Sequence, residues 1–213
     1  MIKAGGTFSI AAENRPVPGC TVSMRETDET YHFALAAKTD ISAELYPYPK
    51  LLVMADGAME VYTGNGRTWK MQANDCLITL INTPTGMRTE TGAVYTEICF
   101  RRNTKMNEII RAGEVFKLAE LLPYQDGRIV NMDLINEPKL KFVLMSFDEG
   151  TGLAEHAAPG EALIFALDGE GIIGYEGTEH PIKAGENFRF AKGGLHSVKA
   201  TGKFKMALLL TLE

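Results

Sequence analysis

The chain has 213 residues and a formal net charge of -5, because 27 acidic residues outnumber 22 basic ones. This length is enough for one large β domain or two small ones with a proper core. The sequence has no basic cluster for nucleic acid and no apolar run of about 20 residues for a membrane. Its cysteines have neither disulfide nor zinc spacing, so we expect a cytoplasmic protein that binds neither nucleic acid nor membrane.

Short β-strands separated by turn sequences account for most of the chain. In the first half the expected strands are FALAA (33–37), LLVMA (51–55), MEVYT (59–63), CLITLI (76–81) and AVYTEICF (93–100). In the second half they are KFVLMSF (141–147), ALIFAL (162–167), GIIGYE (171–176), NFRFA (187–191) and KMALLLTL (205–212). Glycine, proline and Asn/Asp clusters such as TGNG and AKGG lie between them. This rhythm predicts an antiparallel sandwich or barrel.

A segment of different character, residues 103–138, separates the two series of strands. EVFKLAELL (114–122) has apolar residues at helical intervals and stops before Pro123, which predicts a short helix. A turn at residues 125–127 and a strand at 128–135 follow. We interpret this segment as a structured connector that packs the two halves together.

The two series of strands can be superposed, which indicates an internal repeat. A shift of 112 places residues 45–57 on residues 157–169, with Asp56-Gly57 on Asp168-Gly169. A shift of about 111 then places residues 71–80 on 182–191. Turn residues and alternating apolar positions agree over the whole length, although few residues are identical.

The second half resembles a cupin, whose two motifs read G(X)5HXH(X)3-4E(X)6G and G(X)5PXG(X)2H(X)3N. The matching positions are Gly150, His156 and Gly169 in the first motif and Gly185, Gly193 and His196 in the second. The first half resembles the same unit more faintly, so the chain as a whole resembles a bicupin of the cupin 2, or conserved-barrel, type.

The resemblance implies an all-β fold of two double-stranded β-helix (jelly-roll) cupin barrels in tandem, with a short helix in the connector. The expected domains are residues 1–102, a barrel without metal-ligand histidines; residues 103–138, the connector; and residues 139–213, a barrel with a partial metal motif. In such a barrel, alternate strand residues face the interior, so His156 and His196 should meet there.

Two of the four expected metal ligands are missing from the second half. Ala158 stands at the second histidine position and Ala162 at the glutamate position, while Ala191 and Ala200 replace a proline and an asparagine that supply no metal bond. Glu161 lies one residue from the glutamate position, which turns its side chain to the other face unless a bulge re-aims it. It is therefore a weak candidate ligand.

The first half departs further from the motif. Under the same shifts its ligand positions hold Glu44, Tyr46, Lys50 and Thr85, and no histidine. These side chains could hold a polar ligand, or Glu44 and Lys50 could form an ion pair at the rim. We favour the ion pair.

His156 and His196 are thus the candidate ligand-binding and metal-binding residues, and no catalytic residue is assigned. With four apolar residues expected to line the cavity, Ile164, Ala166, Phe190 and Met206, they would form a polar spot in an apolar small-molecule site. Two imidazoles also suit a divalent transition metal (Zn, Fe, Ni, Mn or Cu) at low occupancy.

Three functions remain open from the sequence. The first is a cupin-type protein that binds a small molecule at a degenerate two-histidine site. The second is a metal-dependent cupin enzyme, a dioxygenase or isomerase, that uses His156 and His196. The third is an architectural role for the paired barrels, and the resemblance also allows a homodimer.

Overall fold

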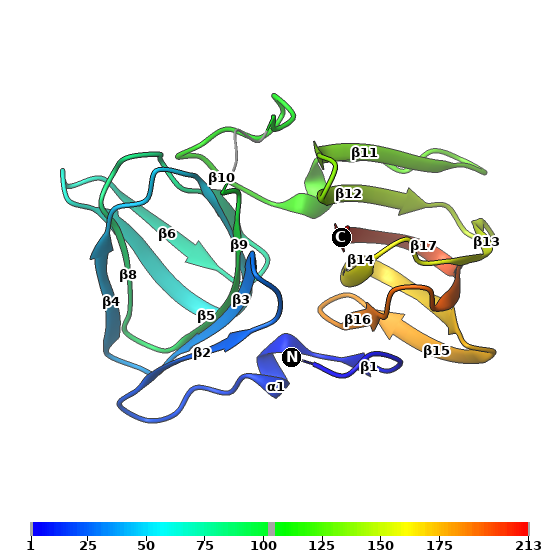
Figure 1. Ribbon diagram of the computed structural model, residues 1–213, viewed down its shortest axis with the longest axis horizontal. Coiled ribbons are helices and arrows are strands. Elements are labelled where there is room, and N and C mark those ends of the chain that lie inside the picture. Colours follow the sequence, from blue (N-terminus) through cyan, green and yellow to red (C-terminus); the bar gives the residue numbers. More distant parts are fainter. Residues whose placement is uncertain (1, 102–104, 213) are drawn as a thin grey trace. The chain divides into compact units, whose positions relative to one another are not determined.

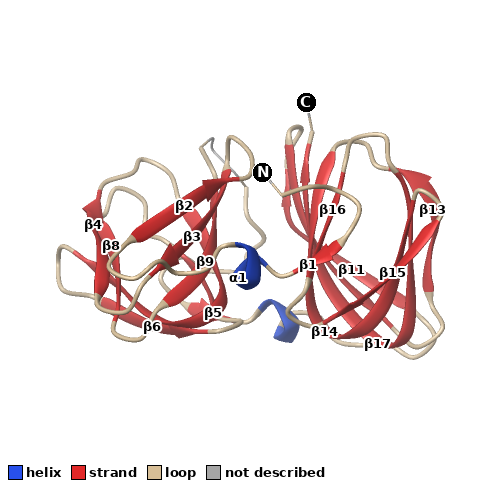
Figure 2. Cartoon of the chain, turned by 90° about the horizontal axis from the view of Figure 1, so that it is seen from below, coloured by secondary structure: helices blue, strands red, loops and turns tan. Residues whose placement is uncertain are grey.

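The computed structural model describes residues 2–101 and 105–212. The chain forms two compact units, one of residues 10–101 and 108–117 and the other of residues 2–9, 105–107 and 118–212. Each unit is built almost wholly from curled antiparallel β-sheets (Figures 1 and 2). The predicted all-β fold of cupin barrels is confirmed.

The N-terminal unit has one short helix and nine strands among its described residues. They are α1 (Ile10–Glu13), β2 (Thr21–Arg25), β3 (Thr30–Leu35), β4 (Thr39–Glu44), β5 (Lys50–Thr63), β6 (Thr68–Gln72), β7 (Cys76–Ile78), β8 (Thr85–Thr89), β9 (Ala93–Cys99) and β10 (Val115–Phe116). One sheet has the order β10-β7-β5-β9-β3-β2, and β5 also joins the second sheet through β6 and β8, with β4 beside β8.

The C-terminal unit repeats this plan. Its strands are β1 (Thr7–Phe8), β11 (Ile129–Asn136), β12 (Leu140–Phe147), β13 (Gly152–Ala157), β14 (Glu161–Tyr175), β15 (Thr178–Lys183), β16 (Asn187–Phe190) and β17 (Leu195–Thr211). The order is β1-β16-β14-β17-β12-β11, with β13 beside β17 and β15 beside β14. The long strand β14 therefore corresponds to β5, and β17 covers the positions of both β8 and β9.

The repeated Asp-Gly pair bends the long strand of each unit at the same place. Gly57 and Gly169 have φ angles of 74° and 69°, and the strand pairing shifts register beside each of them. A Cβ atom at Gly169 would lie 1.7 Å from the carbonyl oxygen of Lys203. Only glycine combines a positive φ with so close an approach of two backbones. The bend lets one strand pair with different partners on its two sides: β14 pairs with β16 before the bend and with β15 after it.

The connector matches its prediction in part. Residues 114–122 form no α-helix: Val115–Phe116 is strand β10, which pairs with β7, and a single 3₁₀ turn spans Leu118–Glu120. Sheet pairing of Val115 with Leu77 overrides the helical spacing of the apolar residues. The predicted turn is present, since Arg128 N donates to Gln125 O (3.1 Å), and the predicted strand is β11.

The two compact units also differ from the expected domains at both ends. Strand β11 forms a hairpin with β12, so the C-terminal unit also contains residues 118–138, which were expected in the connector. Residues 2–9 also belong to this unit, because β1 pairs with β16, and Gly5 N donates to Arg189 O (3.1 Å). Backbone pairing of this kind between distant segments leaves no mark in local composition.

Each unit has its own apolar core on the concave side of its sheets. The core of the N-terminal unit is rich in methionine (Met54, Met59, Met71, Met87) and includes Tyr95. The core of the C-terminal unit is rich in aromatic rings (Phe147, Phe188, Phe190, Phe204). Within the described residues, no helix is long and apolar enough to span a bilayer.

Candidate functional site

His156 and His196 face each other across two neighbouring strands. They are register partners in the antiparallel pair β13 and β17, and their ring centroids lie 4.2 Å apart. His156 is exposed, whereas His196 is buried. The two rings therefore converge as the spacing predicted, but the prediction that both lie in the barrel interior is wrong for His156, which is at the surface.

Both imidazoles are held in one orientation by backbone carbonyl groups. Nδ1 of His156 lies 2.8 Å from Ala154 O, and Nδ1 of His196 lies 3.2 Å from Gly194 O. A carbonyl oxygen only accepts, so each Nδ1 carries the proton of a neutral ring and each Nε2 keeps its lone pair. The pair thus offers two acceptor nitrogens for a ligand.

His196 is kept neutral by its surroundings. Burial lowers its pKa below 6.5, and a positive charge on the neighbouring His156 would lower it further, although the hydrogen bond to Gly194 O opposes this effect. A neutral imidazole is the form that accepts a hydrogen bond or binds a metal ion.

Aromatic side chains surround His196. Phe190 stacks on its ring at 4.1 Å between centroids with an interplanar angle of 28°. Tyr175 is the register partner of His196 on β14, and its ring lies 5.6 Å from that of Phe190. Sequence analysis missed Tyr175. Gly194 packs against the tyrosine ring, since a Cβ atom there would lie 2.6 Å from it.

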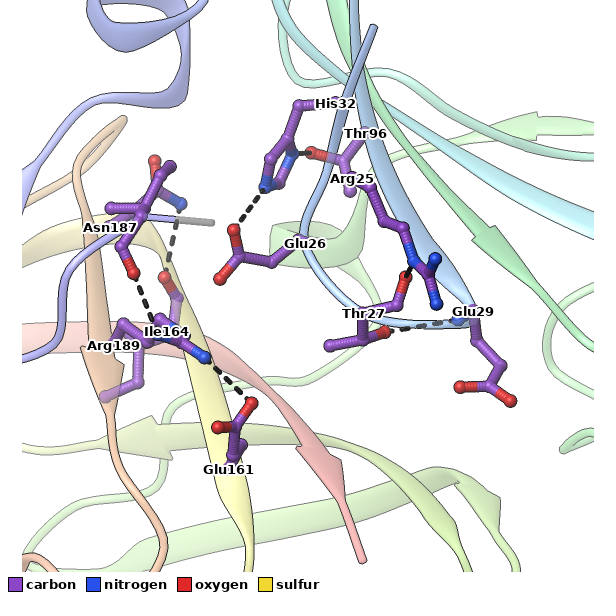
Figure 3. Close-up of polar contacts among 11 residues, drawn as sticks. Arg25, Glu26, Thr27, Glu29, His32, Thr96, Glu161, Ile164, Asn187 and Arg189 are labelled. Carbon is purple, nitrogen blue, oxygen red and sulfur yellow. Dashed lines mark hydrogen bonds and ion pairs between the residues drawn. The ribbon is translucent and has the colours of Figure 1, made fainter.

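The two alanines at the missing ligand positions are buried, and Glu161 does not replace the missing carboxylate. Glu161 forms an ion pair with Arg189 (2.8 Å), which also donates to Ile2 O (2.8 Å) (Figure 3). Strand alternation accounts for this, since Ala162 and not Glu161 faces the core. Among the described residues, no group of three or more His, Cys, Asp or Glu side chains is placed to hold a metal.

The four apolar residues expected to line the cavity lie in the core of the C-terminal unit. Ile164, Ala166, Phe190 and Met206 are all buried, and Ala166 pairs directly with Met206. Of these four residues, Phe190 contacts an imidazole, that of His196.

The remaining histidines lie elsewhere. His32 is fully buried in the N-terminal unit, where its Nδ1 lies 2.9 Å from Thr96 Oγ1 and its Nε2 lies 3.9 Å from Glu26 Oε2 (Figure 3). His180 is half-buried against Phe188. Neither takes part in the pair.

In the N-terminal unit, the four side chains at the ligand positions do meet, but with different partners from those expected. Lys50 forms an ion pair with Glu97 (Nζ to Oε1, 2.9 Å) and not with Glu44. Glu44 instead accepts a hydrogen bond from the hydroxyl of Tyr46. Glu97 lies on β9, far from Lys50 in the sequence, and was not a candidate.

These two barrels, with two facing histidines in one of them, define a cupin-type fold. The family model described as the cupin domain matches residues 143–212. No curated protein matches the sequence. A cupin 2 conserved barrel domain protein from Leptotrichia buccalis is 26% identical, with a TM-score of 0.83 over 99% of this chain and 98% of that one. Residues 143–212 therefore match a cupin domain, and the chain as a whole shares the fold of a cupin 2 conserved barrel protein.

More distant structures share the fold. A salicylate 1,2-dioxygenase from Pseudaminobacter salicylatoxidans is 11% identical, with a TM-score of 0.64 over 94% of this chain and 80% of that one. The YlbA protein of E. coli is 12% identical, with a TM-score of 0.61 over 99% of this chain and 93% of that one. At these identities the likeness concerns architecture, because one fold hosts many chemistries.

Proposed function

We propose that this chain is a small-molecule-binding cupin whose ligand is recognised by the two imidazoles of the C-terminal barrel. The observation that carries the proposal is that both Nδ1 atoms are committed to backbone carbonyls, so both Nε2 lone pairs remain available. Alanine at the two missing ligand positions leaves small, apolar neighbours. A ligand with hydrogen-bond donors and a flat apolar face would match the two Nε2 atoms and the ring of Phe190.

The test is a screen of small aromatic amines, amides and phenols by ligand-observed NMR. We expect some compounds to bind the native protein and to lose binding in His156→Gln and His196→Gln. His180→Gln, a histidine of the same unit outside the pair, is the matched control and should keep binding. If the same compounds bind all four proteins equally, the proposal is wrong.

A second function, a metal-dependent enzyme, is favoured by one specific observation. Histidines that bind metals usually donate their other ring N–H to a carbonyl or carboxylate, as both of these do. The donor set is nevertheless incomplete, because the part of the chain that the structure describes supplies two imidazoles and no carboxylate at the pair. A divalent ion would need water or substrate for the rest of its shell, and would supply Lewis acidity there.

Calorimetric titration with Zn²⁺, Ni²⁺, Fe²⁺ and Mn²⁺ separates the two functions. One equivalent of metal bound by the native protein and lost in both pair variants, together with His156-dependent consumption of dioxygen, would favour the enzyme. If neither metals nor small molecules distinguish the variants, the architectural function replaces both. A reducing, cytoplasmic location is part of the proposal, and three free cysteines support it.

A further inference from the structure

The two units place different chemistry at equivalent positions of their barrels. Glu44 pairs with Thr85 between β4 and β8, just as His156 pairs with His196 between β13 and β17. The differences in residue number, 112 and 111, are those of the internal repeat. The N-terminal unit therefore has its own version of the candidate site.

The remaining two positions distinguish the units further. Ala158 and Ala162 leave their places small in the C-terminal unit, whereas Tyr46 and Lys50 fill the equivalent places in the N-terminal unit. Both alanines are buried, and so is Lys50. The C-terminal barrel thus lacks two ligand side chains, whereas the N-terminal barrel has the ammonium group of Lys50 at one of the equivalent positions.

Polar and aromatic groups surround the ammonium group of Lys50 as they would a bound cation. The carboxylate of Glu97 is 2.9 Å from Nζ, and the centroid of the Tyr46 ring is 3.4 Å away. Lys50 is 7% exposed and Glu97 is 5% exposed, so water screens the pair weakly. A cation over a phenol face gains further attraction from the ring quadrupole.

The groups around this ammonium carry an excess of negative charge. Two carboxylates, Glu44 and Glu97, lie at the site with one lysine. Burial, together with the Glu97 carboxylate 3.5 Å from its sulfur, raises the pKa of the Cys99 thiol to about 12. Burial and the same carboxylate also raise the pKa of Tyr95, whose hydroxyl has no hydrogen-bond partner among the described residues. The site therefore favours a cation.

The free space beside Lys50 is too small for another ligand. The cavity that Glu44, Tyr46, Lys50 and Thr85 help to line has a volume of about 10 Å³. That is roughly the space of a single water molecule. The cation position is therefore filled by the chain itself.

We propose that Lys50 is a tethered cation: its ammonium group occupies a cation site formed by Glu97, Tyr46 and Glu44, which is closed to external ions in the native protein. Removing the side chain beyond Cβ opens the site to a small primary ammonium ion. The inference concerns the N-terminal barrel alone and stands independently of the function proposed for the histidine pair.

Chemical rescue tests the proposal. Lys50→Ala removes three carbons and the ammonium group, which n-propylammonium would replace atom for atom. Lys50→Met loses the same charge but keeps the space filled, so it is the matched control. In Lys50→Ala/Glu97→Leu the carboxylate is gone as well, and leucine is the residue at the equivalent position, 208, of the other barrel.

Thermal unfolding of the four proteins is measured in n-propylammonium chloride and in sodium chloride of equal ionic strength. We expect both single variants to melt below the native protein, because an unpaired buried carboxylate remains. Only Lys50→Ala should be rescued, with its folding equilibrium shifted about 11-fold at ten times the dissociation constant of propylammonium.

Two results would overturn the proposal. The first is equal stabilisation of Lys50→Met or of the double variant, which would indicate a general solvent effect. The second is the absence of any rescue of Lys50→Ala. If Lys50→Ala fails to fold in sodium chloride, recovery of folded protein in propylammonium but not in sodium chloride supports the proposal, and failure in both salts contradicts it.

Discussion

The bend in strand β14 can be tested by substituting Gly169 with alanine. Gly169 has a φ of 69°, and its missing Cβ would lie 1.7 Å from the carbonyl oxygen of Lys203 on the neighbouring strand. That oxygen belongs to the backbone and cannot rotate away. In Gly169→Ala the two long strands that carry Ala162 and His196 must move apart at this point.

Gly177→Ala separates the two contributions to the destabilisation. Gly177 also has a positive φ, 77°, but its Cβ would enter open space. A non-glycine residue in the left-handed region costs about 1–2 kcal/mol, and this is the expected loss for Gly177→Ala. Gly169→Ala should lose about 1–3 kcal/mol more, because overpacking adds to the strain.

The measurement is thermal unfolding followed by far-UV circular dichroism. For a chain of this length, 1 kcal/mol corresponds to a change of about 2–4 °C in Tm. Gly169→Ala should therefore melt about 2–12 °C below Gly177→Ala. Equal Tm values for the two variants would refute the argument that backbone approach, and not φ alone, requires glycine at the bend.

Two further predictions concern pH and thiol chemistry. Burial lowers the pKa of His32 to about 4, so the unfolded chain binds a proton near pH 6.5 that the folded state accepts only near pH 4. Neutral His32 therefore contributes fully to the free energy of unfolding above pH 6.5, and about 3 kcal/mol of that free energy is lost as the pH falls to 4. Urea unfolding at pH 7, 5.5 and 4.5 should show that the free energy of unfolding depends less on pH in His32→Gln than in the native protein. The same pH dependence in both proteins would contradict this prediction. In the native protein a thiol reagent should modify only Cys20, which is exposed, and it should modify the two buried cysteines only after unfolding. Rapid modification of all three cysteines in the native protein would be inconsistent with the packing of the N-terminal core.

The residues that the sequence predicted best are those with a fixed local requirement. Asp56-Gly57 and Asp168-Gly169 aligned the two repeats, because a left-handed backbone favours glycine wherever it occurs, although the strands expected on either side of each pair are one continuous strand. His156 and His196 could be paired by their spacing within a repeated motif. The exclusion of Glu161 from the core face also followed from strand alternation alone.

Other features depended on contacts between residues far apart in the chain. Residues 114–122 have helical spacing, but pairing of Val115 with β7 places the segment at the edge of a sheet. Lys50 was matched with Glu44 because the repeat places both at ligand positions of the motif, whereas its partner Glu97 comes from β9. Tyr175 drew no attention because nothing in its own segment marks it as a neighbour of His196.

The sequence by itself therefore determined the fold class, the internal repeat and the two histidines, since turn chemistry and the two-residue period of strands are local properties. Only the tertiary structure decided which ionic groups are paired, which segments complete each barrel and what surrounds the imidazoles. Those outcomes depend on the register between strands brought together from distant parts of the chain. Where such groups are buried, their pairing affects the stability of the fold, because a charge removed from water needs a counter-charge within a few ångströms.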